Sequence, residues 1–198
     1  HADHYQTNRA YGVGAYSKGE VLLAQLAAVM GADLRDAGLK AYFAEWQFKH
    51  PGINDFKRTM EKTSGLDLDW YFQYFVNTTH TIDYAIDRVA EGTESTTINC
   101  SRIGAMPMPQ NITVTYQDGS VAHYLAPLVM MRGQRPLAPG ETLLPDWPWT
   151  NPMYELEVPT GSGILRVELD AERQTADVDR SNNSVEFDPA IKRLYERN

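Results

Sequence analysis

The chain has 198 residues, of which 42% are hydrophobic, and its formal net charge is −8. Such a length and apolar content suffice for one large domain or two small ones with a real core. The negative charge and the scattered Lys and Arg residues argue against a nucleic-acid surface, which needs clustered basic side chains. No apolar run of about eighteen residues occurs, so the sequence predicts no membrane-spanning helix. The single cysteine, Cys100, excludes an intrachain disulfide and is expected to be a buried strand residue.

The first eighty residues are predicted to form helices. Ser17-Lys18-Gly19-Glu20 fits a capping box, in which the serine oxygen and the glutamate carboxylate bind backbone N–H groups at a helix start. We therefore expect a helix from Ser17 to Gly31. Helical spacing of apolar residues predicts further helices at 33–48, at 54–65 and from about 67, the last one rich in buried aromatic side chains.

After His80 the period of the apolar residues changes from about 3.6 to 2, which indicates β-strands. Asp118-Gly119 is typical of a hairpin turn, because these residues accept positive φ angles. About seven antiparallel strands in a sandwich or open barrel are expected. The predicted strands are 81–89, 96–103, 111–116, 121–131, 154–158, 164–169 and a short one at 175–178.

The predicted fold class is α+β, with the change of architecture between residues 77 and 81. The parts are a helical one at 1–80, an antiparallel β-sandwich at 81–180 and a C-terminal tail at 181–198. In the tail, Ile191, Leu194 and Tyr195 give a weak helical pattern, typical of either a short docking helix or a frayed end.

Residues 132–152 are rich in Pro and Gly, which predicts a long loop. Trp147 and Trp149 flank a proline within it. Exposed tryptophans can stack on a sugar or contact a protein, whereas buried ones close the edge of a sandwich. From the sequence, both interpretations of this pair stay open.

Ala15-Tyr16-Ser17-Lys18-Gly19, followed by an amphipathic helix, resembles the tyrosine-x-lysine-glycine segment of the aminopeptidase N family of zinc metallopeptidases, a gluzincin family. The similarity to the later helices of that family's catalytic domain then continues in chain order. The matching segments are Leu39–Phe43, Phe48–Pro51, Asp55-Phe56, Met60-Glu61 and Ser64–Phe72. Met106–Pro109 and Asp179–Asn183 are similar to a bacterial branch of the family.

The resemblance implies the helical second half of a thermolysin-like catalytic domain, followed by a β-sandwich. In such enzymes a zinc ion held by two histidines and a glutamate activates water, and a second glutamate is the general base. A tyrosine phenol donates a hydrogen bond to the developing oxyanion. The match gives this role to Tyr16, and Tyr11 is a weaker candidate for lining the same pocket; either ring could instead only pack. Lys18 and Gly19 have structural explanations, the lysine stem covering the first turn and the glycine permitting close packing.

The sequence departs from a complete enzyme in its metal ligands. No His-Glu-x-x-His occurs, and His1 and His4 lack the intervening glutamate of that motif, while His50, His80 and His123 are isolated. The glycine-rich segment that binds the substrate amino terminus in the family is also absent from this sequence. We therefore expect zinc in a full-length parent, no metal on this chain, and no activity of this chain alone.

Two hypotheses follow from the sequence. In the first, the chain is part of a zinc-dependent aminopeptidase that hydrolyses N-terminal peptide bonds. Its partners are a peptide substrate and a missing N-terminal catalytic lobe, and the surface around Tyr16, Val21 and Leu22 should be exposed. In the second, it is a non-catalytic β-sandwich interaction module that binds protein or carbohydrate, with a closed helical surface and a groove near Trp147. A periplasmic or secreted location is favoured over a cytoplasmic one.

Overall fold

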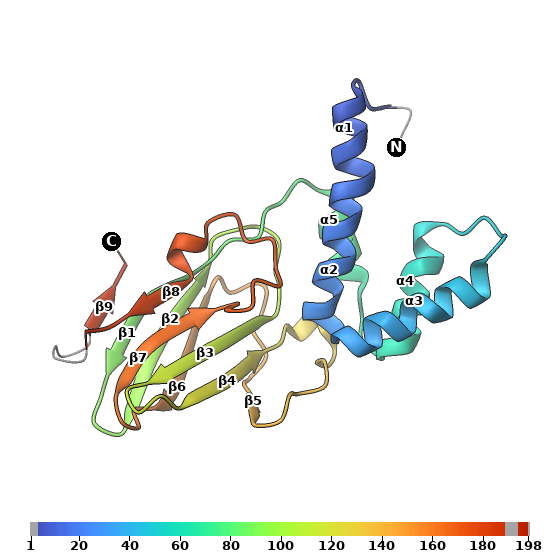
Figure 1. Cartoon of the computed structure of the whole chain (residues 1–198). Coiled ribbons are helices and arrows are strands. Elements are labelled where there is room, and N and C mark those ends of the chain that lie inside the picture. Colours follow the sequence, from blue (N-terminus) through green and yellow to red (C-terminus); the bar gives the residue numbers. More distant parts are fainter. Residues whose placement is uncertain (1–3, 189–193, 198) are drawn as a thin grey trace.

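The structure is a computed structural model that describes residues 4–188 and 194–197. It confirms the α+β class, with a helical part followed by two packed sheets (Figure 1). The helical elements are α1 Asn8–Gly12, η2 Val13–Ser17, α2 Lys18–Met30, α3 Ala32–Trp46, α4 Ile53–Ser64 and α5 Asp69–Asn77. No helix in the described residues has both the length and the hydropathy that crossing a membrane requires.

The first helix begins earlier than the capping box predicted, so that prediction is wrong. Elements α1, η2 and α2 form one continuous rod (Figure 1), and its N-cap is Thr7, whose side chain accepts from the Ala10 N–H at 3.1 Å. Ser17 has helical angles, φ −63° and ψ −44°, and makes no side-chain cap. The segment Val13–Ser17 is itself helical, so Ser17 does not lie at a helix start and no serine cap is needed there. The predicted end is confirmed, since Gly31 follows α2 at φ 88°.

The helices pack through a core that lies around the C-terminal half of α2. Leu26, Val29 and Met30 on α2 are fully buried, and Tyr71 on α5 is fully buried beside them. The Tyr71 hydroxyl donates to the Leu22 carbonyl at 2.8 Å, and burial raises the pKa of this phenol far above its ordinary value. The prediction that the aromatic helix is mostly buried is confirmed by α5.

Two sheets form the second part of the chain. The first has the order β6-β2-β1-β9, and the second has the order β5-β4-β3-β7-β8. The strands are β1 Tyr84–Glu91, β2 Ser95–Arg102, β3 Gln110–Tyr116, β4 Val121–Ala126, β5 Glu141–Leu143, β6 Met153–Pro159, β7 Ile164–Leu169, β8 Ser184–Glu186 and β9 Leu194–Glu196. Residues on β3 and β6 alternate between more and less buried, because successive side chains point to opposite faces of a sheet.

Several predicted strands differ from the structure. The strand predicted at 121–131 ends at Ala126, and a 3-10 turn, η3, follows at Val129–Met131. The segment 175–178 makes only an isolated bridge, between Asp177 and Ile82. The predicted loop 132–152 contains β5, which pairs with β4 in parallel, an exception to the expected antiparallel sheet.

The weak helical pattern of the tail is wrong for its described part. Leu194–Glu196 is strand β9, which pairs with β1 through Val89↔Tyr195 and Arg88↔Glu196, while Ile191 lies outside the described residues. The edge of β1 offers free backbone groups, and pairing with them satisfies more hydrogen bonds than a short isolated helix could. Residues 180–182 form a short 3-10 turn, η4.

The chain changes from helix to strand between Asn77, where α5 ends, and Tyr84, where β1 begins. One hydrophobic cluster includes residues of both parts, so a single core joins the helices to the sheets. The division into separate domains at residues 80 and 180 therefore stays a prediction. Cys100 is fully buried on β2, as expected, and burial raises the pKa of its thiol.

Trp147 is a core residue and not a surface platform. Its side chain is 1% exposed, it stacks on Tyr154 at 4.9 Å between ring centroids, and its Nε1–H donates to the Asn151 carbonyl at 2.8 Å. Trp149 is 45% exposed. Trp147 is therefore not available to stack on a sugar, and the interpretation that it closes the sandwich edge is confirmed, whereas the ring of Trp149 stays accessible.

Candidate functional site

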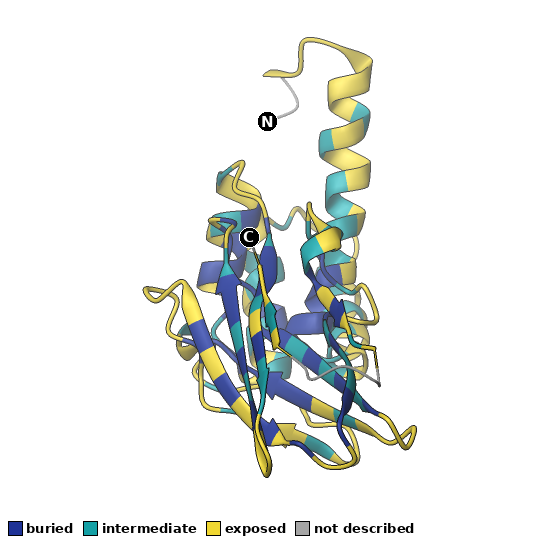
Figure 2. Cartoon of the chain, turned by 90° about the vertical axis from the view of Figure 1, so that its left-hand side faces the viewer, coloured by how far each residue is buried: buried dark blue, intermediate teal, exposed yellow. Residues whose placement is uncertain are grey.

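Tyr16 lies in the π-helical segment η2, near the middle of the exposed rod. No described residue before Leu22 is buried (Figure 2, where the free part of the rod is mostly yellow). Tyr16 itself is 66% exposed, and Val13 is 56% exposed. Within the part of the chain that the structure describes, its hydroxyl makes no hydrogen bond, so it remains available to a ligand.

The π-turn aligns Tyr16 with the tyrosine five residues earlier. In an α-helix, with about 3.6 residues per turn, residues five apart lie on different faces. The wider turn of η2 reduces that offset, and the rings of Tyr11 and Tyr16 meet edge to face at 5.8 Å with an angle of 86° between them. Tyr5 continues the series, 5.8 Å from Tyr11, and packs over Gly14, where an added Cβ would lie 2.3 Å from the Tyr5 hydroxyl. Segments of π-helix inside α-helices occur frequently at functional sites.

The C-terminal half of the rod is fixed to the rest of the chain at two points. The first is the buried bond from Tyr71 to the Leu22 carbonyl. The second joins α2 to the sandwich, where Gln25 Oε1 accepts from the Ala176 N–H at 2.6 Å. Leu22 is buried at 9% exposure, so the exposed surface predicted around Tyr16, Val21 and Leu22 is wrong at Leu22. The exposed surface extends instead toward Tyr11 and Val13.

The neighbours of Tyr16 in the motif have structural roles that differ in part from those expected. The Lys18 ammonium lies 5.3 Å from the centre of the Phe75 ring and donates to the Thr78 carbonyl at 3.5 Å, so it joins α2 to the end of α5. An added Cβ at Gly19 would meet no atom within 4 Å. Close packing therefore does not explain the glycine, contrary to the prediction.

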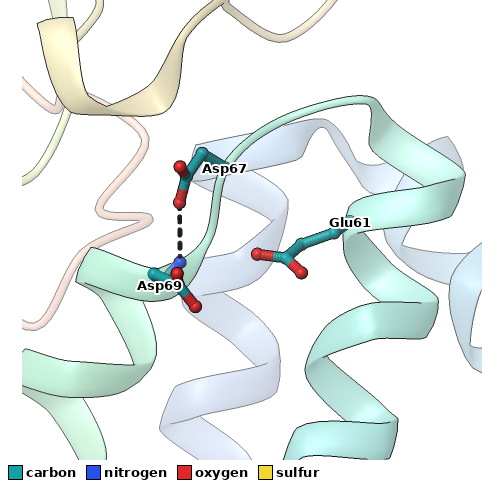
Figure 3. A group of neighbouring side chains, drawn as sticks. All are labelled: Glu61, Asp67 and Asp69. Atoms are coloured by element: carbon teal, nitrogen blue, oxygen red, sulfur yellow. Dashed lines mark hydrogen bonds between the residues drawn. The ribbon is translucent and has the colours of Figure 1, made fainter.

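The described residues do not form a zinc site. Among them, the one group of three His, Cys, Asp or Glu side chains with converging ligand atoms is Glu61, Asp67 and Asp69, whose oxygens lie within 4.8 Å of one another (Figure 3). It contains no imidazole or thiolate, which the zinc sites of proteins commonly include. His1 lies outside the described residues, and His4, His50, His80 and His123 join no such group.

The acidic group instead organises the start of α5. Glu61 Oε1 accepts from the Leu68 N–H at 3.1 Å, and Asp67 Oδ1 accepts from the Asp69 N–H at 3.0 Å, the bond drawn in Figure 3. Lys57 pairs with Asp69, and Arg132 pairs with Asp67 at 3.4 Å. Carboxylates at a helix N-terminus are stabilised by its free N–H groups and its dipole. Capping and ion pairing account for this cluster.

Comparison with known proteins agrees with the sequence resemblance. Residues 2–75 match the Peptidase family M1 domain, so this part of the chain is similar in sequence to that family. The match supports the resemblance to the aminopeptidase N-like M1 peptidases that Tyr16 to Gly19 and the later segments up to residue 75 carry, and that resemblance is confirmed for this part of the chain. No curated protein sequence matches the chain.

The fold is similar to that of a much longer enzyme. The crystal structure of aminopeptidase A from Legionella pneumophila in complex with aspartic acid superposes with a TM-score of 0.63 and 9% sequence identity, over 87% of this chain. The chain spans 18% of the length of that protein. At this identity the similarity concerns the fold alone.

Proposed function

We propose that the chain is part of a zinc-dependent aminopeptidase that hydrolyses N-terminal peptide bonds, in which the Tyr16 phenol stabilises the oxyanion. The observation that carries the proposal is an exposed tyrosine, 66% accessible, on a π-turn within the segment that matches the M1 peptidases. Zinc would be a cofactor of the full-length enzyme, held by residues other than those described here.

The chemistry of Tyr16 is that of a neutral donor. When the scissile carbonyl becomes tetrahedral, its oxygen gains negative charge, and a phenolic O–H aimed at this oxygen binds it more strongly than the neutral carbonyl. Tyr16 is suited to this role because its hydroxyl has no competing acceptor within the described residues. Tyr11 would line the same pocket and would hold the Tyr16 ring from the side.

The rest of the catalytic domain would cover the free half of the rod. Residues 8–21 form about four helical turns without one buried side chain, and an isolated helix of this length is marginal in water. Tyr11, Val13 and Tyr16 are the large apolar side chains exposed there, and Tyr5 is exposed just before the helix; apolar surface of this kind marks an interaction site. We propose that a second catalytic lobe contacts them and adds the metal ligands and the general base.

The first experiment compares the 198-residue chain with the full-length protein on aminoacyl p-nitroanilides, each with and without added zinc. The proposal predicts hydrolysis by the full-length protein alone and no rate above background for the chain. Tyr16→Phe in the full-length protein should lower kcat by about 100- to 1,000-fold. Tyr42→Phe is the matched control, because the Tyr42 ring packs against Phe56 far along α3. Equal activity of the Tyr16→Phe and Tyr42→Phe enzymes would refute the role of Tyr16.

A further inference from the structure

The rod that carries Tyr16 is joined to the sandwich by a buried polar side chain. Gln25 lies on α2, nine positions after Tyr16, and is 1% exposed. Its Oε1 accepts from the Ala176 N–H at 2.6 Å, a bond between residues that are 151 positions apart in the sequence. The other end of the Gln25 amide, its NH2 group, is a donor and could not replace the oxygen opposite this N–H. The bond to Ala176 therefore fixes the orientation of the Gln25 amide.

The Ala176 N–H is held in place from both sides. Thr175, which precedes it, is buried and donates its N–H and its hydroxyl to Asp170 Oδ2, at 2.9 and 2.7 Å. Asp177, which follows it, accepts from the Tyr84 N–H at 2.9 Å, so this residue is fixed to the start of β1. An amide between two fixed neighbours points in one direction. The sandwich thus presents a preorganised donor to α2.

Gln25 and Tyr71 together anchor one turn of α2. The Tyr71 hydroxyl donates to the Leu22 carbonyl at 2.8 Å. Burial raises the pKa of the Tyr71 phenol, and a hydrogen bond from the Gln25 side chain acts in the opposite direction, which shows that the two side chains are neighbours. No described residue before Leu22 is buried, so the part of the rod with Tyr16 projects from this anchor (Figure 2).

The distance from the anchor to Tyr16 makes the position of Tyr16 sensitive to the direction of the rod. At about 1.5 Å per residue, the Tyr16 backbone lies about 13 Å along the helix from Gln25. A tilt of about 5° at the anchor would displace the backbone at that distance by about 1 Å. A displacement of about 1 Å at a catalytic group can lower the rate on the order of a hundredfold. The bond at Gln25 is therefore placed where a small change has a large effect on Tyr16.

We infer that Gln25 is a positioning residue, through which the sandwich sets the direction of the rod and hence the place of the Tyr16 phenol. The inference rests on the proposed function, because it concerns the same tyrosine. Gln25 is buried in the core and acts only through the helix. The β-sandwich thereby contributes to catalysis without contact with the substrate.

The first test changes the helix side of the bond in the full-length enzyme. Gln25→Met removes the acceptor and keeps a side chain of nearly the same length. On aminoacyl p-nitroanilides, kcat should fall about five- to fiftyfold. KM should change less than about twofold, because an interaction made only in the transition state is lost. In a Tyr16→Phe background the same change should leave kcat unchanged, since no hydroxyl remains to be positioned.

The second test changes the sandwich side and leaves the helix intact. Thr175→Val removes the hydroxyl bond to Asp170 and should lower kcat about two- to fivefold. Thr96→Val is the matched control, because it removes another buried threonine hydroxyl, which bonds to Thr160 at 3.0 Å, and should leave kcat unchanged. Urea unfolding shows whether each enzyme is folded. If Gln25→Met does not fold, the comparison of the two valine variants decides the matter.

The outcomes separate this inference from the proposal on which it rests. If Gln25→Met lowers kcat by the same factor with and without the Tyr16 hydroxyl, Gln25 does not act through Tyr16 and the inference is overturned. Equal kcat values for Thr175→Val and Thr96→Val would also overturn it. In both cases a large loss of kcat in Tyr16→Phe would leave the proposed function intact. A fully active Tyr16→Phe enzyme would refute the role of Tyr16, and the role of Gln25 with it.

Discussion

The rings of Tyr11 and Tyr16 meet edge to face, with 5.8 Å between their centroids and 86° between their planes. Five residues separate them, and the π-turn at Val13–Ser17 brings them together. This contact restrains a phenol that the rest of the described chain leaves in solvent. It is the structural reason to expect Tyr16 in one preferred direction.

Removal of the Tyr11 ring should therefore reduce the effect of Tyr16. Aromatic pairs of this kind contribute about 0.5–1.5 kcal/mol, so Tyr11→Ala should lower kcat of the full-length enzyme by about two- to tenfold. Tyr11→Phe keeps the ring and should retain nearly full activity. Steady-state kinetics on both variants decides the matter, and identical kcat values for the two would show that the ring contact has no influence.

Two helical glycines should respond oppositely to alanine. A Cβ at Gly38 would lie 2.5 Å from the sulfur of Met60, which is itself completely buried, whereas a Cβ at Gly19 meets nothing within 4 Å. Gly19→Ala should stabilise the chain by about 0.5–1 kcal/mol through helix propensity. Gly38→Ala adds overpacking of about 1–3 kcal/mol, so it should be the less stable variant. Urea unfolding of both variants measures the difference, and equal midpoints would contradict the packing seen between α3 and α4.

The hydroxyl of Tyr71 should matter for stability. Tyr71→Phe removes the buried bond to the Leu22 carbonyl and should lower the free energy of unfolding by about 0.5–1.5 kcal/mol. Tyr42→Phe is the control, because in the described structure its hydroxyl has no hydrogen bond; it should change stability by less than about 0.5 kcal/mol. A Tyr71→Phe protein as stable as the control would mean that this bond does not fix α2.

Arg135 and Glu141 form a largely buried salt bridge at 2.6 Å, and this pair predicts a specific pH dependence of stability. The folded-state pKa of Glu141 lies below its ordinary value, so the folded protein binds the proton less readily than the unfolded chain does. Its contribution to stability is thus complete above the ordinary glutamate pKa of about 4.3 and is lost as the pH falls through the lower folded-state pKa. Glu141→Gln should lose stability at pH 7 and show a smaller further loss in acid. Thermal unfolding from pH 3 to 7 tests this, with Glu45→Gln as a control that should follow the wild type.

Local patterns predicted the elements in which burial follows a regular pattern along the sequence. The alternation of Ile112, Val114 and Tyr116 identified β3, because one face of that strand is buried. The clustered aromatics identified α5 for the same reason. The spacing of apolar residues within each segment indicates its secondary structure, and it can be recognised without knowledge of any distant contact.

Features that depend on distant or competing interactions were not predictable in this way. Ser17 carries the local signal of a helix start, yet the residues before it are already helical through the π-turn, so the helix does not begin there. Tyr195 joins a strand only because β1 presents a free edge far away in the sequence. Similarly, the sequence resemblance singled out Tyr16, but it did not predict the contact between the Tyr11 and Tyr16 rings. Residues five apart lie on different faces of an ordinary α-helix, and only the π-turn brings these two together.

The most direct test of the central claim compares Tyr16→Phe with wild-type enzyme, both full length, in binding a phosphinic pseudopeptide whose tetrahedral oxygen mimics the oxyanion. If Tyr16 stabilises only the charged oxygen, the variant should lose affinity for this compound in proportion to its loss of kcat, by about 100-fold or more, with KM nearly unchanged. If instead the affinity for the compound is retained while KM rises, Tyr16 binds the substrate and does not stabilise the transition state.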